Sequence, residues 1–528
     1  MSWLAFKNNA MFLQSMRQRM RLPTVISFAI LTFIILSLIF SNASVNSHRY
    51  LSVNLEIFQQ ILNAQLFLLL GLGSWNVFQA AVRERVVGTL EFHRSSPTPA
   101  FWQMIGLLLG AVSLEWIIFL VTVPISLVIS IQTPLGFSLV VQVYVAVVLC
   151  ALLFHMVTLF LGLLRIGKLQ NRKMNFSGVF FFIVFYIFSH MLWGFASYGM
   201  EVRKVSAHLT CFPVLSQVYE KAQENIYHGS DKKYPQQNRY YQDYRRHKDV
   251  KSMFYKVEMS PLSLQIILLL PLLYLLTNGI IRLLKQPHAP PFSKGQQLIG
   301  LAYIFFIFLA DVYIEYVHPK IDYYGPYSRQ YDTFFIFGFG LLVLICAVMG
   351  IFMSTPSRLS YLIGVKKSSR MGRKLTLMDD HNSCFFWLAG FIVIILSYFL
   401  MLKPLLSSID RNFYSIILII LLIQISAIAG SWEAFILSRY GSSPILFGVG
   451  LSILWIFMPI FGSIFNGEWS RPYYHEPSIL QIFSPFYLES LRTYGERIWL
   501  AFIVNMILAV SVWLLAFKQK EKLKIEKA

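Results

Sequence analysis

The sequence predicts an all-α, polytopic membrane protein with about twelve transmembrane helices in two repeated six-helix halves. Of its 528 residues, 56% are hydrophobic and only 13% are charged, well below the roughly 25% charged residues of a soluble protein. The apolar residues gather in runs close to the ~20 residues that a helix needs to cross a bilayer. Such a composition excludes a disordered chain. The four cysteines show no CxxC spacing, so a disulfide scaffold and a redox or metal motif lack support.

The first predicted element is an amphipathic helix over residues 1–21. Apolar residues recur in it at spacings of three and four, which places them on one face of a helix. We expect this lead helix to lie on the inner leaflet of the membrane and to continue into the first span; an unstructured basic tail is the alternative. The apolar face consists of Phe6, Ala10, Leu13, Met16 and Met20.

The predicted spans form a first half over residues 22–284 and a second half over residues 298–517, joined by a linker at 285–297. The order of loop lengths repeats between the halves, which predicts a parallel duplication. In this pairing the long inner loops Arg83–Ile105 and Thr355–Ser383 correspond, and residues 200–261 form a long outer loop. The predicted spans are Leu22–Phe40, Ile57–Val82, Gly106–Ile131, Ser138–Leu164, Phe176–Gly199, Leu262–Leu284, Leu298–Val317, Thr333–Ser354, Cys384–Leu402, Phe413–Leu437, Pro444–Phe465 and Arg497–Phe517.

The distribution of positive charge predicts the orientation. About 26 of the 45 lysines and arginines lie in the segments on the side of the two termini, and about 7 lie in the short loops opposite. Loops rich in lysine and arginine stay on the inner side of a membrane, so both termini, including the basic tail 518–528, are predicted to be cytoplasmic. The net charge of +20 is therefore mainly a topology signal, and no nucleic-acid partner is expected.

The most informative stretch is the inner loop from Arg83 to Gln103, RERVVGTLEFHRSSPTPAFWQ. Glu91 and Arg94 are three residues apart and can pair on a helix. The run Ser95–Pro99 forces a break, after which Thr98 is a good N-cap and Pro99 a good first helical residue. The loop is therefore predicted to form a helix, a sharp turn and a new helix. A polar inter-span loop without further function is the alternative.

This loop resembles the hallmark of the ABC-2 family of ABC-transporter permeases, in which an acidic–basic run precedes GTLE and a Ser/Thr-Pro turn leads into the third span. The chain departs from that pattern at Val86-Val87 and at Phe92-His93-Arg94. The resemblance implies that the loop contacts a nucleotide-binding subunit and that the chain is the permease of an exporter in a bacterial inner membrane. The matching residues are Arg83, Glu84, Arg85, Gly88, Thr89, Leu90, Glu91, Ser96 and Pro97.

The chain contains no GxxxxGK[ST] phosphate loop, the string whose backbone and lysine hold ATP in many nucleotide-binding proteins. We therefore expect no enzyme activity and no cofactor on this chain. ATP would be bound by a separate ABC ATPase subunit in two copies. The other expected partners are the lipid bilayer and an exported substrate that the sequence does not identify.

Ionisable residues within the predicted spans are candidates for a polar substrate path, because such residues usually face a protein interior or a cavity. Glu115 and Glu433 lie near inner ends, where snorkelling or pairing with a loop arginine is an equal alternative, and Arg439 is a plausible partner of Glu433. Asp311 and Glu315 share one helix face, and the alternative to a substrate path is an acidic pair at the membrane interface. No metal site is predicted. His155 and His190 are expected to be packed and hydrogen-bonded.

Two other functions remain open at this point. Twelve spans in two halves also suit an ion-coupled secondary transporter, although acidic residues within the spans are few. A polytopic membrane enzyme of envelope biogenesis could use the long outer loop, although no outward cluster of Asp, Glu or His recurs at catalytic spacing.

Overall fold

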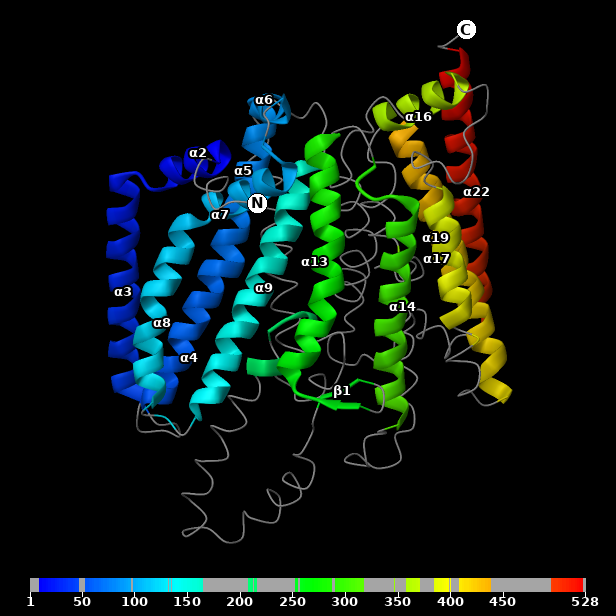
Figure 1. The fold of residues 1–528 in the computed structure, drawn as a ribbon. Coiled ribbons are helices and arrows are strands. Elements are labelled where there is room, and N and C mark those ends of the chain that lie inside the picture. The colour runs from blue at the N-terminus through cyan, green and yellow to red at the C-terminus, as the bar shows by residue number, and fades with distance from the viewer. Residues whose placement is uncertain are drawn as a thin grey trace. The chain divides into compact units, whose positions relative to one another are not determined.

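In the computed structural model, the described residues form helices and a two-stranded hairpin (Figure 1). The chain consists of two units, Met1–Leu163 with Asn171–Lys285, and Leu164–Gln170 with Gln286–Ala528, and each is considered by itself. The structure describes residues 9–46, 53–95, 98–131, 133, 135–164, 208–211, 213–215, 252–254, 257–286, 290–317, 346, 358–370, 384–397, 399, 408–437 and 495–525.

Seven of the described helices are long and apolar enough to cross a membrane. Their side chains are apolar around much of the helix, and a helix of this kind is stable where lipid covers it. The chain is therefore a membrane-embedded helical protein. The seven candidate spans are Leu22–Ser41, Asn54–Arg85, Ser113–Ile131, Phe137–Leu163, Pro261–Lys285, Ser415–Phe435 and Ile498–Lys522.

The first unit contains most of the described helices. A short helix, α2, precedes the first long one, and a π-helical turn, η1, interrupts the second long one (Figure 1). The hairpin leads into the last helix, with Met253 opposite Glu258. The elements are α2 (Ala10–Arg19), α3 (Leu22–Asn46), α4 (Val53–Leu66), η1 (Phe67–Gly73), α5 (Ser74–Val86), α6 (Thr89–Ser95), α7 (Ala100–Ala111), α8 (Ser113–Ile131), α9 (Phe137–Leu163), β1 (Ser252–Phe254), β2 (Val257–Met259) and α13 (Pro261–Lys285).

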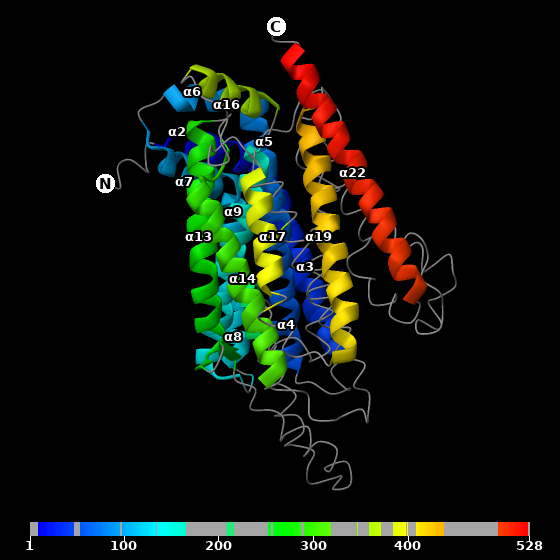
Figure 2. The same cartoon turned by 90° about the vertical axis from the view of Figure 1, so that its right-hand side faces the viewer.

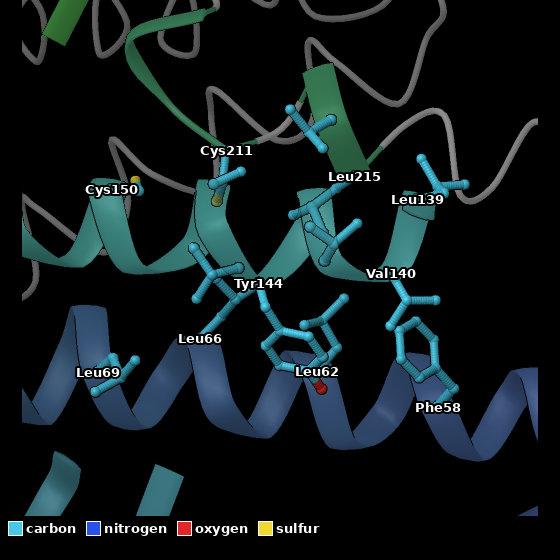
Figure 3. Packing of buried hydrophobic residues seen from close by; sticks show 14 of the residues in the cluster. Phe58, Leu62, Leu66, Leu69, Leu139, Val140, Tyr144, Cys150, Cys211 and Leu215 are labelled. Carbon is cyan, nitrogen blue, oxygen red and sulfur yellow. The ribbon is translucent and has the colours of Figure 1, made fainter. Parts of the chain in front are cut away.

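The core of the first unit lies between α4, α8 and α9 and includes a short segment from outside these helices. Cys211 and Leu215 of that segment pack with the core, and Cys211 lies close to Cys150, near the middle of α9 (Figure 3). Backbone that is not part of a spanning helix is tolerated at this depth when protein buries it. The segment that contains Cys211 and Leu215 is therefore part of the protein core beside α9.

A chain of buried polar side chains crosses the same core. Gln65 of α4 donates to the Thr122 hydroxyl of α8 at 2.9 Å, and the Tyr144 hydroxyl of α9 donates to Gln65 at 3.2 Å. The Ser126 hydroxyl also contacts Tyr144. Each group finds a partner inside the network, as buried polar groups require, so this network ties three helices together.

The second unit is built from five described helices. Within it α17 packs against both α14 and α19, and α19 and α22 lie side by side along much of their length (Figure 2). Gly430 of α19 lets α22 approach closely, because a Cβ there would lie 3.1 Å from Val512 Cγ2. The elements are α14 (Lys294–Val317), α16 (Arg358–Arg370), α17 (Cys384–Ser397), α19 (Ser408–Leu437) and α22 (Gly495–Ile525).

Two predicted boundaries were wrong. The third predicted span is not one helix, because α7 ends at Ala111 and α8 begins at Ser113. The helix after the loop begins at Ala100 and not at Pro99, because Pro99 has an extended ψ of 140° and occupies the N-cap position. The fifth and eleventh predicted spans lie outside the described residues, as does the eighth apart from Cys346.

Candidate functional site

The candidate site is the junction of α5 and α6, where the sequence carries the GTLE string. Val86 ends α5 and Thr89 begins α6, and Gly88 between them has a φ of 81°. Residues that carry a side chain rarely adopt this left-handed backbone conformation, whereas glycine adopts it readily. Glu84 is almost fully buried and accepts a hydrogen bond from the Thr89 hydroxyl. The hydrogen bond between Thr89 and Glu84 thus spans the turn, and these two residues stabilise its conformation.

Two arginines of this loop attach it to the ends of two other helices. The Arg85 guanidinium donates to the carbonyl of Leu163 at the end of α9. Arg94 donates to the carbonyls of Leu284 at 2.6 Å and Leu283 at 3.3 Å, at the end of α13. The last carbonyls of a helix lack intrahelical partners and carry partial negative charge, so cations are favourable there. The loop is therefore braced against α9 and α13.

Other residues of the loop point outward. Val87 is 67% exposed, Glu91 has an exposed side chain that also pairs with Arg94, and Arg83 is exposed. The pairing of Glu91 with Arg94 confirms the prediction from their spacing. The exposed part of the loop thus combines an apolar side chain with charged ones, a composition suited to contact with another protein.

The lead helix docks against α7 beside this loop. Asn9 caps α2, since its side-chain oxygen accepts from the amides of Met11 at 3.1 Å and Phe12 at 3.3 Å, and its amide also donates to the Trp102 carbonyl. Two glycines of α7 allow the close approach. A Cβ at Gly106 would collide with Asn9, and one at Gly110 would lie 2.8 Å from the Ser15 Cβ.

Glu115 joins the lead helix to two longer helices. It is fully buried in the first turn of α8, forms an ion pair with Arg19 of α2 and accepts from Asn76 of α5 at 2.7 Å. A buried carboxylate is costly unless it is paired and hydrogen-bonded. Glu115 is thus paired with an arginine, although that arginine belongs to the lead helix and not to a loop as expected.

The other predicted site residues are spread along the chain. Leu90 is buried within α6, whereas Ser96 and Pro97 lie outside the described residues. Asp311 and Glu315 belong to α14, but their side chains lie outside the part of the chain that the structure describes. In the second unit Glu433 of α19 lies 3.7 Å from Lys520 of α22. Lys520 is thus the ion-pair partner found here, and the predicted partner Arg439 is not described.

Two further predicted features concern histidine and metal. His155 is fully buried, and its Nε2 lies 2.9 Å from the Leu69 carbonyl, so the expected packed role is confirmed. His190 lies outside the described residues. Across the part of the chain that the structure describes, no group of three His, Cys, Asp or Glu side chains could hold a metal ion.

Sequence reasoning missed the residues that brace the site. The sequence pattern indicates a motif at Arg85 and does not single out Arg19, yet each has a specific partner in the structure. Arg19 and Glu115 are 96 residues apart, and Arg94 and Leu284 are 190 apart. No local spacing rule reports such pairs, although a basic residue directly before a span and an acid at the start of another are weak signals.

No family model, curated protein or solved structure matches this chain.

Proposed function

We propose that this chain is the membrane-spanning permease subunit of an ABC-type exporter, and that a separate ATPase subunit grips it at the junction of α5 and α6. The observation that carries the proposal is the bracing of this junction by Arg85 and Arg94. A loop that only connects two spans has no need for a buried carboxylate, a left-handed glycine and two helix-capping arginines.

The braced loop can transmit force because it is attached to three helices. It continues α5 directly, binds the end of α9 through Arg85 and binds the end of α13 through Arg94. A displacement of α6 by a partner is therefore passed to all three helices and is not absorbed by the turn. Closure of two ATPase subunits on ATP would supply the displacement, since a ligand shifts a conformational equilibrium only through differential interaction with the two states.

The lead helix extends the same connection. Arg19 and Asn76 share one oxygen of Glu115, which joins α2, α5 and α8 at one point. We propose that α2 lies on the inner leaflet and moves with α5 and α8. The Glu115 carboxylate is held by an arginine and an amide in this arrangement. This favours the exporter over an ion-coupled transporter, in which a spanning acid binds the driving ion.

The finer topology belongs to this proposal. Twelve spans with both termini in the cytoplasm of a bacterial cell would place the junction of α5 and α6 on the side where ATP is available. The outer segment around Cys211 would then close the core from the opposite side.

The test is co-purification of the full-length chain with the ABC ATPase encoded nearest to it. Val87→Glu and Glu91→Arg alter exposed side chains and should leave the fold intact, yet we expect each to weaken the complex by about tenfold or more, as loss of a central interface contact does. Glu56→Arg is the matched control, because Glu56 lies near the start of α4, at the opposite end of the helix that α4, η1 and α5 form, where its carboxylate accepts from Gln60 at 3.1 Å. An ATPase that binds all variants equally, or none including the unaltered chain, would contradict the proposal.

A further inference from the structure

Two helix contacts of this protein follow one pattern. Gly73-Ser74-Trp75 with Phe78 in the first unit returns as Gly430-Ser431-Trp432 with Phe435 in the second, 357 residues further along. The tryptophan and phenylalanine rings are stacked in both strings, with centroids 6.5 Å apart in the first and 6.0 Å apart in the second. The strings lie at the start of α5 and near the end of α19 and share one local geometry.

In both strings the glycine faces another long helix. A Cβ at Gly73 would lie 2.7 Å from His155 Nε2 of α9, and one at Gly430 would lie 3.1 Å from Val512 Cγ2 of α22. His155 and Val512 are again 357 residues apart. Because the offset is the same on both helices, η1–α5 with α9 and α19 with α22 are in the same register.

A hydrogen bond between the two helices repeats as well. His155 Nε2 lies 2.9 Å from the Leu69 carbonyl, and Trp513 Nε1 donates to the Ser426 hydroxyl at 3.1 Å. Leu69 and Ser426 are 357 residues apart. In these contacts a glycine admits the neighbouring helix and a polar group bonds to it.

The first long helix, α3, is built differently. It contains no glycine, and 6% of the residues in its apolar stretch are buried, against 22% to 61% in the other six candidate spans of the described chain. It packs on its own unit at the end away from α2, where Ile39 lies with Ile57 and Ile61. The half of α3 next to α2 therefore presents an exposed face.

That face of α3 is bulky and apolar. The hydroxyls of Ser27 and Thr32 each donate to a backbone carbonyl one turn earlier, at 2.8 Å, so they need no outside partner. Helices in a membrane approach one another through small residues, as the glycines above do, whereas large side chains offer contact area to flexible acyl chains. The face thus suits lipid better than another helix. Its residues are Leu22, Ile26, Ile30 and Phe33, which are 49% to 73% exposed.

Two exposed cations lie where this face begins. Helix α2 ends at Arg19, α3 begins at Leu22, and α2 lies across the end of α3 (Figure 1). Arg19 turns inward to its ion pair with Glu115. Arg17 and Arg21 stand on either side of the bend and are exposed, and no described residue forms an ion pair with them. These two arginines are therefore available to an anion from outside the protein.

The apolar side chains of α2 extend the same surface. Met11 and Ser15 are buried against the protein, whereas Leu13 is 37% exposed and Met16 and Met20 are partly exposed. Leu13, Met16 and Met20 belong to the apolar face predicted from the sequence. That face is thus turned away from the protein core, as in a helix that lies in the headgroup region of a bilayer.

We infer that Arg17 and Arg21, together with the exposed face of α3, bind an anionic phospholipid of the inner leaflet. The two guanidinium groups pair with its phosphate, whose geometry arginine matches, and its acyl chains lie along α3. The Cα atoms of Arg17 and Arg21 are at most about 14 Å apart, because they are four positions apart in the chain, so both side chains can reach one headgroup. The inference rests on the proposed position of α2 at the inner leaflet and not on the exporter activity.

The experiment is native mass spectrometry of the full-length chain in a neutral detergent, titrated with phosphatidylglycerol or with phosphatidylcholine of the same acyl chains. Arg17→Gln combined with Arg21→Gln removes the two exposed cations. The matched control is Lys285→Gln combined with Lys518→Gln, which removes two exposed cations near the ends of α13 and α22. Thermal unfolding without added lipid verifies that both double variants keep the fold.

We expect the arginine variant to bind phosphatidylglycerol about 30-fold more weakly, because each cation beside an anionic headgroup contributes about fivefold. The control should bind it as the unaltered chain does, and soluble glycerol 3-phosphate should not compete, since it lacks the acyl chains that α3 holds. Equal losses in the two double variants, equal affinity of the unaltered chain for both lipids, or competition by glycerol 3-phosphate would overturn the inference.

A phosphatidylglycerol with a photoreactive acyl chain locates the site. We expect its label on residues 22–33 of α3, and we expect the arginine variant but not the control to lose this label. Label on other helices alone, or crosslinking of a photoreactive residue at Ile30 to a second copy of the chain, would overturn the inference. No ATPase enters these measurements, so their failure leaves the proposed function standing, and failure of the co-purification leaves the lipid site standing.

Discussion

The helix pair of the first unit and that of the second show how one arrangement is maintained by different chemistry. In the first pair, the π-helical turn η1 precedes Gly73, and His155 of α9 bonds to the carbonyl of Leu69 within it. In the second, α19 is a regular α-helix, and Trp513 of α22 bonds to the side chain of Ser426. A π-helical turn disturbs the regular bonding of a helix. In the first pair a carbonyl of this turn therefore takes part in the contact, whereas in the second pair α19 contributes a side-chain hydroxyl.

The two pairs also differ in how their polar ends are satisfied. Glu115 is fully buried and held by Arg19 and Asn76, so the first pair is tied to the lead helix. Glu433 takes the position of Asn76 in the second string and reaches Lys520 of α22 directly. Among the described residues, the first pair is thus tied to the lead helix, whereas the ion pair of Glu433 with Lys520 lies within the second pair. The following substitutions test this contrast.

The largest effect should come from the stacked tryptophans. Trp432 is 1% exposed and Trp75 is half-buried. Trp432→Ala should lower the free energy of unfolding by about 3–5 kcal/mol, the usual cost of emptying a buried aromatic site. Trp75→Ala should cost clearly less. Thermal unfolding of the purified protein in one detergent compares the two variants. Equal shifts in Tm would contradict the prediction that the more buried tryptophan contributes more stability.

The ion pairs should follow. Arg19→Leu leaves a buried carboxylate without its cation, which costs about 3 kcal/mol or more in a protein interior. Lys520→Leu should cost about 1 kcal/mol or less, because Lys520 is 28% exposed and solvent screens this pair. Arg19→Leu combined with Glu115→Leu should recover part of the loss in the same unfolding assay. A double variant as unstable as Arg19→Leu alone would show that the loss does not come from the unpaired Glu115 carboxylate.

The smallest effect should come from the glycines at the helix contacts. Gly73→Ala brings a Cβ within 2.7 Å of His155, whereas Gly430→Ala brings one to 3.1 Å from Val512. Overpacking costs about 1–3 kcal/mol, so we expect Gly73→Ala to lie in that range and Gly430→Ala below it. Adding His155→Ala to Gly73→Ala should relieve the collision, which a smaller shift in Tm than the sum of the two single variants would reveal.

Local features of the candidate site could be predicted from the sequence. The spacing of Glu91 and Arg94 indicated their pairing, and the run from Ser95 to Pro99 indicated the break between α6 and α7. Both depend on neighbours within a few residues, for which helix geometry sets the distances. The π-helical turn and the break at Val112 were not predicted, because the apolar pattern continues through both.

The long-range contacts could not be predicted in this way. The string at Gly73 and Gly430 is visible in the sequence, yet a four-residue match among apolar helices has little weight by itself. The repeated stacking and the repeated hydrogen bond between helices give it weight, and both are properties of packed helices.

The sequence by itself determined that this chain is a helical membrane protein, because long runs of apolar residues favour lipid over water whatever the helices contact. It also determined the turn between α5 and α6, since glycine and proline restrict the backbone locally. Only the tertiary structure decided that Arg19 meets Glu115, that Arg85 and Arg94 close two helix ends, and that α19 repeats α5. These contacts join residues far apart in the chain, so they arise only when the helices pack against one another.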